Sequence, residues 1–515
     1  MPIRMEKDQP DGGQQPRRQR GSNPIMRLLP VILLFVFKRP KILIPVLIIG
    51  AVWYFFLGGS QFFSPALDDE YSSEFAFGAT LDPEIYDKAE VFEPVVYGSP
   101  VGSSSGLPAS VTLQKYAPKR LHQGQQGSCV GWASSYAART ILEAQSSGKN
   151  PNQVAFSPSF LYNQIALQNC QGAYMRDAME TMRRGGVLPF NEYPYDARTC
   201  SVLPDPSEQS RAQAFRIKGY NRLTLGSENY SPDIQGIKQH LAQGSPVVIG
   251  MQVGGTFMHQ MRGRKVWQPT QRDYSLYGFS GHAMCVIGYD DNYQGGAFQI
   301  MNSWSESWGD NGIAWVPYRD FKFFVKEAYG LYPMGTAPKY DPGKMEVQFG
   351  LVDNASQNLL PLTQASDRVF QTRTPIRKGD KFKVAIANSI ECYIYVFGEE
   401  TDGSSYVLFP YTPKHSPYCG ITGTRLFPKD YSMTADELGN KDRIAIVVTK
   451  EPIDFEAMNQ RINRSSAATY SGRLQAALAD QSISQVSFQA ADAIGFSCNT
   501  QGKNAVGMVI EIDKR

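Results

Sequence analysis

The hydrophobic pattern of residues 107–335 changes character halfway along. The first half favours helices, which we expect at 129–146, 157–166 and 174–185. After a further helix at 233–243, short apolar runs predict buried strands at 246–251, 282–289, 296–301 and 312–317. Helices and strands that follow one another in separate blocks are typical of an α+β fold.

A second domain is predicted from 345 to 515, beyond a Pro- and Gly-rich stretch at 333–344. Apolar and polar residues alternate there as they do in half-buried strands. The predicted strands are 382–387, 392–397, 406–410, 443–448 and 506–512, and helices are predicted at 453–462 and 469–480. We expect a β-sandwich with appended helices and a binding role, with a protein as the candidate partner.

The N-terminal region is predicted to anchor the chain in a membrane. Residues 42–59 form an apolar run of nearly the length that a bilayer requires, and basic residues concentrate in the tail 1–41. The positive-inside rule leaves this tail in the cytoplasm and places the rest of the chain outside it, in the periplasm if the cell is bacterial. A cleaved signal peptide and a buried core helix are the alternatives. Residues 60–106 are expected to be a linker with a flexible Gly- and Ser-rich end.

Composition narrows the set of partners and cofactors. The 515-residue chain has a net charge of +3, and its basic residues form no stripe with interleaved aromatic residues. Nucleic acid is therefore not expected as a partner. The seven cysteines include no Cys-x-x-Cys pair, and no cluster has the spacing of metal ligands. We expect neither a metal nor another cofactor.

The candidate nucleophile is Cys129, which follows a Gly-Ser turn and precedes a helical run. A thiol at a helix N-terminus lies in the positive end of the macrodipole, which favours the reactive thiolate. Gln123 lies six positions earlier. Its side-chain amide and the Cys129 backbone N–H are expected to form an oxyanion hole. Cys285, inside an apolar strand, is interpreted as a core residue.

The candidate base is His282, at the start of a predicted strand. A second predicted strand ends at Asn302, and antiparallel pairing of the two strands would bring its amide beside the imidazole. The amide oxygen then accepts the imidazole N–H and holds the ring facing the thiol. Of the other histidines, His240 lies in a polar run and is expected in solvent.

The order Gln123, Cys129, His282, Asn302 resembles that of papain-like cysteine peptidases. Further motifs agree with this family, namely Ser157-Pro158-Ser159-Phe160-Leu161-Tyr162, Cys170-Gln171-Gly172-Ala173-Tyr174, Gly185-Gly186-Val187 and Asn302-Ser303-Trp304. The resemblance covers about 107–331. It implies one helical lobe and one lobe formed by a twisted sheet, with a cleft between them. It also implies that a peptide or protein substrate is hydrolysed through a thioester on Cys129.

The resemblance extends to residues that would bind substrate. Gly172 and Ala173 match a turn whose backbone pairs with an extended peptide. Three further residues match the pocket for the second residue before the scissile bond, and because they are largely apolar, a hydrophobic substrate side chain is expected there. These residues are Tyr174, Met175 and Ala283.

Two structural roles also follow from the resemblance. Trp304 is expected to cover the contact between His282 and Asn302. Cys170 and Cys200 match positions of disulfide cysteines in the family, but the usual partners of both are missing, so a direct Cys170–Cys200 bond is a hypothesis.

Other interpretations of the same residues remain open. One is a catalytically weak or inactive papain-like scaffold that acts as a tethered binding protein, since Gly281 stands where the family often carries Asp. Another is an aminopeptidase or a transferase on the same fold. The long helical inhibitory segment of many family members has no counterpart here, and the acidic and aromatic stretch 74–97 is the candidate for covering the cleft.

Overall fold

The computed structural model describes residues 3–7, 75–96, 99–101, 106–225, 231–332, 341, 343–429 and 431–515. The predicted membrane span at 42–59 and most of the N-terminal tail lie outside these ranges. Within the ranges described, no helix combines the length and the apolar character needed to cross a bilayer.

The helical lobe is organised around one long buried helix. α5 (Cys129–Gly131) continues through the π-helical stretch Trp132–Arg139 into α6 (Thr140–Ser147), which ends at a left-handed Gly148. Two helices, α7 (Pro158–Ile165) and α8 (Met175–Arg184), pack against its first half. α7 starts where it does because the Ser157 side chain caps the Phe160 N–H and Pro158 occupies the first turn.

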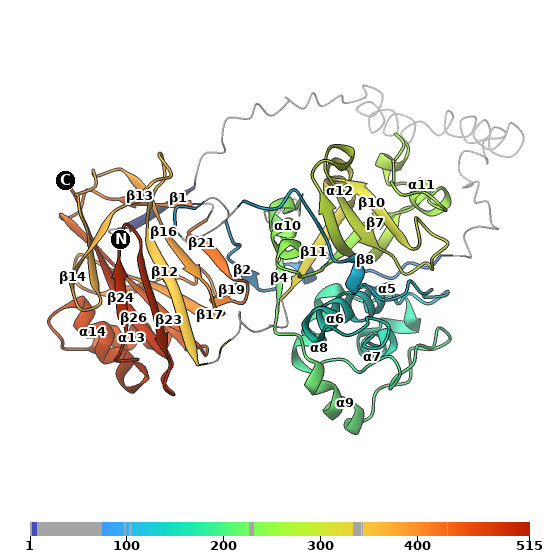
Figure 1. The fold of residues 1–515 in the computed structure, drawn as a ribbon, viewed down its shortest axis with the longest axis horizontal. Coiled ribbons are helices and arrows are strands. Elements are labelled where there is room, and N and C mark those ends of the chain that lie inside the picture. Colours follow the sequence, from blue (N-terminus) through green and yellow to red (C-terminus); the bar gives the residue numbers. More distant parts are fainter. Residues whose placement is uncertain are drawn as a thin grey trace, which may run out of the picture. The chain divides into compact units, whose positions relative to one another are not determined.

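The second lobe is a seven-stranded antiparallel sheet whose main order is β10-β9-β8-β7-β11-β4, with β3 also paired to β8. Its strands are β3 (Ser110–Thr112), β4 (Tyr220–Arg222), β7 (Val247–Val253), β8 (Ser280–Asp290), β9 (Ala297–Met301), β10 (Ile313–Pro317) and β11 (Val325–Leu331). β8 is buried from His282 to Tyr289 and contacts the long helix. Figure 1 shows α6, α7 and α8 grouped apart from β7, β10 and β11.

The expectation that His240 lies in solvent is wrong. His240 lies on α10 (Ile234–Ala242) and is only 2% exposed. Its Nε2 is 2.7 Å from the side-chain amide nitrogen of Asn221, and its ring packs on the backbone of Gly330 in β11. Burial lowers the pKa of His240 to about 3, so the ring is a neutral packing element of the sheet lobe.

The C-terminal domain is a β-sandwich with two helices on one outer face. One sheet contains β12 (Lys344–Asp353) between β16 (Lys381–Asn388) and β25 (Ile494–Asn499). The other contains β23 (Lys441–Thr449) between β17 (Cys392–Glu399) and β26 (Ala505–Asp513). Alternate residues of β12, β16, β23 and β26 form a shared core. α13 (Phe455–Arg464) and α14 (Tyr470–Leu478) cover the opposite face of β23 and β26.

The region predicted as a linker contains a packed segment, which we call the arm (described residues 82–96 and 99–101). It begins with α4 (Pro83–Tyr86), and β2 (Val91–Phe92) then pairs in parallel with β19 (His415–Ser416) of the C-terminal domain. The Val96 N–H donates to Thr424 O at 2.7 Å, and Val101 is completely buried. The arm is therefore held by backbone pairing and by core contacts, which composition alone does not reveal.

Residues at the very start of the chain also pair with this domain. β1 (Ile3–Lys7) lies antiparallel to β22 (Tyr431–Ala435). A membrane span at 42–59 with a cytoplasmic tail would place β1 and β22 on opposite sides of the bilayer. The pairing and that topology exclude one another, so the sequence-based topology conflicts with this strand pair.

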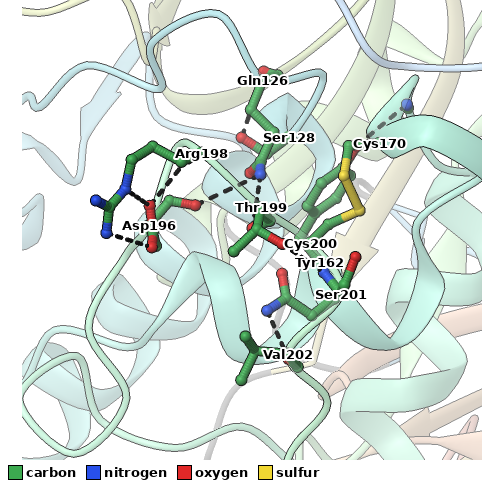
Figure 2. The surroundings of a disulfide bond; sticks show 12 residues. Gln126, Ser128, Tyr162, Cys170, Asp196, Arg198, Thr199, Cys200, Ser201 and Val202 are labelled. Carbon is green, nitrogen blue, oxygen red and sulfur yellow. Dashed lines mark hydrogen bonds and ion pairs between the residues drawn. A yellow bond between two sulfur atoms is a disulfide. The ribbon is translucent and has the colours of Figure 1, made fainter.

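A disulfide joins Cys170 to Cys200, with Cα atoms 5.8 Å apart, as the hypothesis of a direct bond between them states. The loop that carries Cys200 also supports the turn before Cys129, because the Gln126 side-chain amide donates to Thr199 O at 2.9 Å (Figure 2). The loop around Cys200 is therefore joined both to the chain just before the Gly172–Ala173 turn, through the disulfide, and to the turn before Cys129, through Gln126.

We expect replacement of both cysteines by serine to destabilise the peptidase domain. A disulfide that closes a loop with a sequence separation of 30 restricts the unfolded chain by about 3–4 kcal/mol. Urea unfolding of the full chain should show this loss, and a reductant should destabilise the unsubstituted chain but not the double variant. An unsubstituted chain whose unfolding is insensitive to reduction would contradict the bond.

Candidate active site

Cys129 lies where the long helix meets the central strand of the sheet lobe. It is the first residue of α5, and its side chain is completely buried. The backbone N–H of Ala283 in β8 contacts Cys129 Sγ at 3.3 Å. Residues 154 positions apart are therefore in direct contact, and the thiol lies next to the strand that carries His282.

His282 is fixed by an amide on one side and by an indole on its face. Its Nε2 is 2.8 Å from Oδ1 of Asn302, and the same oxygen accepts the Ser303 N–H at 2.7 Å. Because this oxygen only accepts, Nε2 carries the imidazole proton, and Nδ1 is left as the acceptor. Among the described residues Nδ1 has no hydrogen-bond partner. The Trp304 ring stacks on the imidazole at 4.4 Å between centroids and shields the contact from water.

Gln123 is held in a fixed orientation by its neighbours. Its Oε1 accepts the Ser303 hydroxyl at 2.6 Å, and its Nε2 donates to Gln126 O at 3.0 Å. This leaves the second N–H of the amide, which donates to the carbonyl of Ala76 at 3.2 Å. The Trp304 Nε1–H donates to the same carbonyl at 3.3 Å. The expected oxyanion donor is thus already bound to a peptide oxygen.

That oxygen belongs to a segment of the chain that lies across these residues, which we call the cover (residues 75–81). Phe75 stacks on Trp304 at 4.6 Å, and the Phe77 ring meets His282 edge-on at 6.5 Å. Gly78 O accepts the Ala173 N–H at 2.9 Å, and the Thr80 N–H donates to Ala173 O at 3.1 Å. On the opposite wall, the Ala79 N–H donates to Gly281 O at 3.1 Å.

Two glycines allow the cover to approach this closely. A Cβ on Gly172 would lie 2.6 Å from Gly78 O, and Gly172 also has φ +128°. A Cβ on Gly281 would lie 2.1 Å from Ala79 O. Gly281, which stands where the family often carries Asp, is therefore one of the two residues that accommodate the cover.

Burial decides the charge state of the thiol and the imidazole. Burial raises the pKa of Cys129 to about 12, although N–H groups including that of Ala283 lower it. Burial also lowers the pKa of His282 to about 4, against the opposing effect of Asn302. Near neutral pH both groups are uncharged beneath the cover, and the reactive thiolate is disfavoured.

The expected substrate-binding residues lie along the same cleft. Ala173 pairs with the cover, and Gly172 lies directly against Gly78 of the cover. Leu81 of the cover and Met175 both lie beside Gly250, within 3 Å of where a Cβ on that residue would be. Ala283 pairs with Gly250 in the sheet and is buried, whereas Tyr174 is half-buried directly before α8. No cluster with the makeup of a metal site occurs within the described ranges.

Two residues of this site are not predicted from the sequence. Ser303 orients Gln123, and its place beside Asn302 in the Asn302-Ser303-Trp304 motif is the signal that could have indicated it. Glu327 is only 5% exposed, and its Oε1 accepts the Asp82 N–H, directly after the cover, at 3.2 Å. No motif contains Glu327, and only the register of the sheet brings it to the cleft.

Comparisons with known proteins give the family of this domain. Residues 108–323 match the model of the papain family of cysteine proteases, and residues 376–452 match a domain of unknown function, DUF4384. An uncharacterised peptidase C1-like protein of Acanthamoeba polyphaga mimivirus is 31% identical over 219 residues, which are 41% of this chain and 67% of that protein. Cathepsin K of Mus musculus is 28% identical over 238 residues, 45% of this chain and 65% of its own length.

Among solved structures, xylellain, a cysteine protease from Xylella fastidiosa, aligns over 50% of this chain and 91% of its own, with 23% identity and a TM-score of 0.37. The family model and the viral relative carry the assignment. The chain belongs to the papain family of cysteine peptidases.

Proposed function

We propose that this chain is a latent endopeptidase that cleaves peptide bonds with Cys129 as nucleophile, His282 as base and Asn302 as the residue that orients the base. One observation carries the proposal. The proton on Nε2 of His282 is bonded to Asn302, Nδ1 is left unpartnered among the described residues, and the next N–H along β8 contacts the Cys129 sulfur.

The proposed reaction begins when a substrate replaces the cover. Cys129 transfers its thiol proton to Nδ1 of His282, and the thiolate attacks the substrate carbonyl carbon. The resulting oxyanion accepts a hydrogen bond from the Gln123 N–H that the departing cover releases from Ala76 O, and another from the Cys129 backbone N–H, which lies in the first turn of a helix. His282 then protonates the leaving amine, and a water activated by the same ring releases the acyl group from sulfur.

The cover supports latency for two physical reasons. Its backbone occupies the hydrogen-bonding groups of Ala173 and Gly281 that an extended peptide would use. Its phenylalanines also keep water from the thiol and the imidazole, which holds both groups neutral. Displacement of the cover would remove both obstacles, lowering the pKa of Cys129 and raising that of His282.

Two further statements remain predictions from the sequence. These are the membrane anchor at 42–59, with the peptidase outside the cytoplasm, and a protein partner for the C-terminal domain. Exposure of residues 3–7 to protease on the side of the membrane that carries the peptidase domain would favour the β1–β22 pairing over the anchored topology.

Gly78→Ala is expected to displace the cover, because the new Cβ would lie 2.0 Å from Gly127 O. Each unit by which the pKa of Cys129 then falls gives about tenfold more thiolate, so iodoacetamide should label Cys129 at least about tenfold faster at pH 7. Mass spectrometry of the Cys129 peptide measures the rate. Gly106→Ala is the control, since nothing lies within 4 Å of its Cβ. Equal labelling rates in both variants and the unsubstituted chain would contradict latency.

In the Gly78→Ala chain, Cys129→Ala should lower peptide hydrolysis by a factor on the order of 10⁴ or more. The loss follows because Cys129 is the thiol that contacts β8 directly after His282. Labelling by an epoxide directed at papain-like thiols should vanish too. Cys285→Ala, which removes a buried thiol inside β8, serves as the matched control for a lost sulfur. Hydrolysis that persists without Cys129 would favour the inactive-scaffold interpretation.

Asn302→Ala in the Gly78→Ala chain should lower kcat about 10- to 100-fold with little change in KM, because one buried hydrogen bond to the imidazole is lost. The variant should retain epoxide labelling of Cys129 at a reduced rate. Steady-state kinetics on a fluorogenic peptide test this, and an unaltered kcat would remove the orienting role from Asn302.

A further inference from the structure

Two free thiols lie opposite one another in the C-terminal domain. Cys392, the first residue of β17, pairs in register with Cys419 of β20 (Tyr418–Cys419), and the two side chains are hydrogen-bonded. The Ile394 N–H donates to Pro417 O at 2.9 Å, and hydrogen-bonded positions alternate along an antiparallel strand pair. Cys392 and Cys419 therefore occupy a hydrogen-bonded position, where Cα atoms lie about 5.5 Å apart. A disulfide spans roughly 4.4–6.8 Å between Cα atoms, so the pair is within bonding reach.

A buried arginine lies beside this pair. Arg425 of β21 (Gly423–Phe427) is only 3% exposed. Within the part of the chain that the structure describes, its guanidinium donates to uncharged oxygens, namely Asn388 Oδ1, Ile421 O, Gly423 O and Glu93 O. The Asn388 side chain also donates to Cys419 O at 3.0 Å and so links the arginine to that cysteine. A buried cation whose partners are uncharged favours ionisation of a nearby thiol.

The two thiols differ in acidity for this reason. Burial raises the pKa of Cys419, but the hydrogen bond from the Cys392 thiol and the charge of Arg425 together outweigh it, and the pKa falls below its ordinary value. The same hydrogen bond, together with burial, raises the pKa of Cys392. Cys419 is therefore the thiol that ionises first, and Cys392 remains protonated next to it. A thiolate with a second thiol in reach is the arrangement that converts an oxidised sulfur into a disulfide.

We propose that Cys392 and Cys419 form a redox site, which a small peroxide converts into a disulfide that fastens the arm to the C-terminal domain. The site belongs to that domain and not to the cleft, so this inference does not depend on the proposed peptidase function. A small, uncharged oxidant is favoured because both cysteines are only 2% exposed. β20 is paired to β17 at two positions only, so a local opening of this short strand suffices to admit such a molecule.

The proposed reaction uses one peroxide for each disulfide. The Cys419 thiolate attacks a peroxide oxygen and the O–O bond breaks, which leaves a sulfenic acid on Cys419 and a hydroxide that takes up the proton lost from the thiol. The sulfur of Cys392 then attacks the sulfenic sulfur, its own proton joins the departing hydroxyl, and a second water leaves as the S–S bond forms. The two sulfurs together lose two electrons, and the peroxide gains them. Exchange with an external dithiol reverses the change.

The disulfide would fasten the strand that holds the arm. Pro417 alone separates β19 from β20, and β19 pairs with β2 of the arm. The Val91 N–H also donates to Lys414 O at 2.9 Å, directly before β19. A covalent bond from Cys419 to β17 would restrict the local opening of residues 414–419, and the arm would be held more firmly as a result.

The test maps the thiols of the full chain, purified in the presence of a monothiol, after a short treatment with hydrogen peroxide. The remaining thiols are alkylated, and peptides from a digest without reductant are identified by mass spectrometry. A peptide that joins Cys392 to Cys419 should appear, and dithiothreitol should remove it. Cys498 is the matched control, because it is 8% exposed and burial raises its pKa. Its thiol should be lost at least about tenfold more slowly, since each pKa unit changes the thiolate fraction about tenfold.

Two variants assign the roles of the two sulfurs and the effect on the arm. Cys392→Ala should stop the reaction at the sulfenic acid on Cys419, which dimedone traps, and Cys419→Ala should leave Cys392 unmodified at the same peroxide dose. In the unsubstituted chain, oxidation should slow hydrogen exchange of the Val91 amide roughly tenfold or more. The same treatment of the Cys392→Ala chain should leave that exchange rate unchanged.

Each contrary outcome overturns a stated part of the inference. Loss of the Cys498 thiol as fast as that of Cys419, or a chain oxidised at Cys498 without the joined peptide, overturns the redox site. Dimedone on Cys392 instead of Cys419 overturns the assignment of the nucleophile. A joined peptide with unchanged exchange at Val91 overturns the hold on the arm and leaves the disulfide chemistry in place.

Discussion

The contact between the start of the long helix and strand β8 is the interaction on which the site depends. Through it a backbone N–H of the sheet lobe reaches the sulfur of Cys129 at 3.3 Å, and the neighbouring residue supplies the imidazole. Neither lobe contains a complete site. The helix supplies a thiol and the sheet supplies His282 and Asn302, so their packing determines whether the chemistry is possible. The disulfide, Gln126 and Ser303 all support segments that lead to this contact.

The burial that brings Cys129 and His282 together also keeps both side chains in their neutral, unreactive forms. A thiol and an imidazole enclosed together lose the water that would stabilise their charged forms, and neutral groups are the result. The cover closes the site with the chain's own backbone, and the arm behind it pairs with the C-terminal domain through Val91, Phe92 and Val96. One continuous stretch of chain, residues 75–96, therefore both closes the cleft and pairs with the C-terminal domain.

The sequence predicted most of the elements that position the site. The helix from Cys129, the strand that carries His282, the strand that ends before Asn302, strands β16, β17, β23 and β26 and both helices of the C-terminal domain lie within a few residues of their expected places. Strands β12 and β25 were not predicted. Strand β11 was missed because Lys326 and Glu327 interrupt its apolar run at a bulge. The stretch 74–97 was expected to cover the cleft from its composition, but the sequence did not predict that residues 75–81 do so, because their partners Ala173 and Gly281 lie far away in the chain. Glu327 enters the cleft solely through register, which no local pattern encodes.

Backbone amide hydrogen exchange in the cover can show whether this segment closes the cleft of the folded chain. In the folded full chain, the N–H groups of Ala79 and Thr80 are bonded to Gly281 O and Ala173 O. Both should exchange far more slowly than in a free peptide, and should lose that protection when a small inhibitor attached to Cys129 takes their place. If these two amides exchange at the free-peptide rate while the amides of β8 remain protected, the cleft is open and the account is wrong.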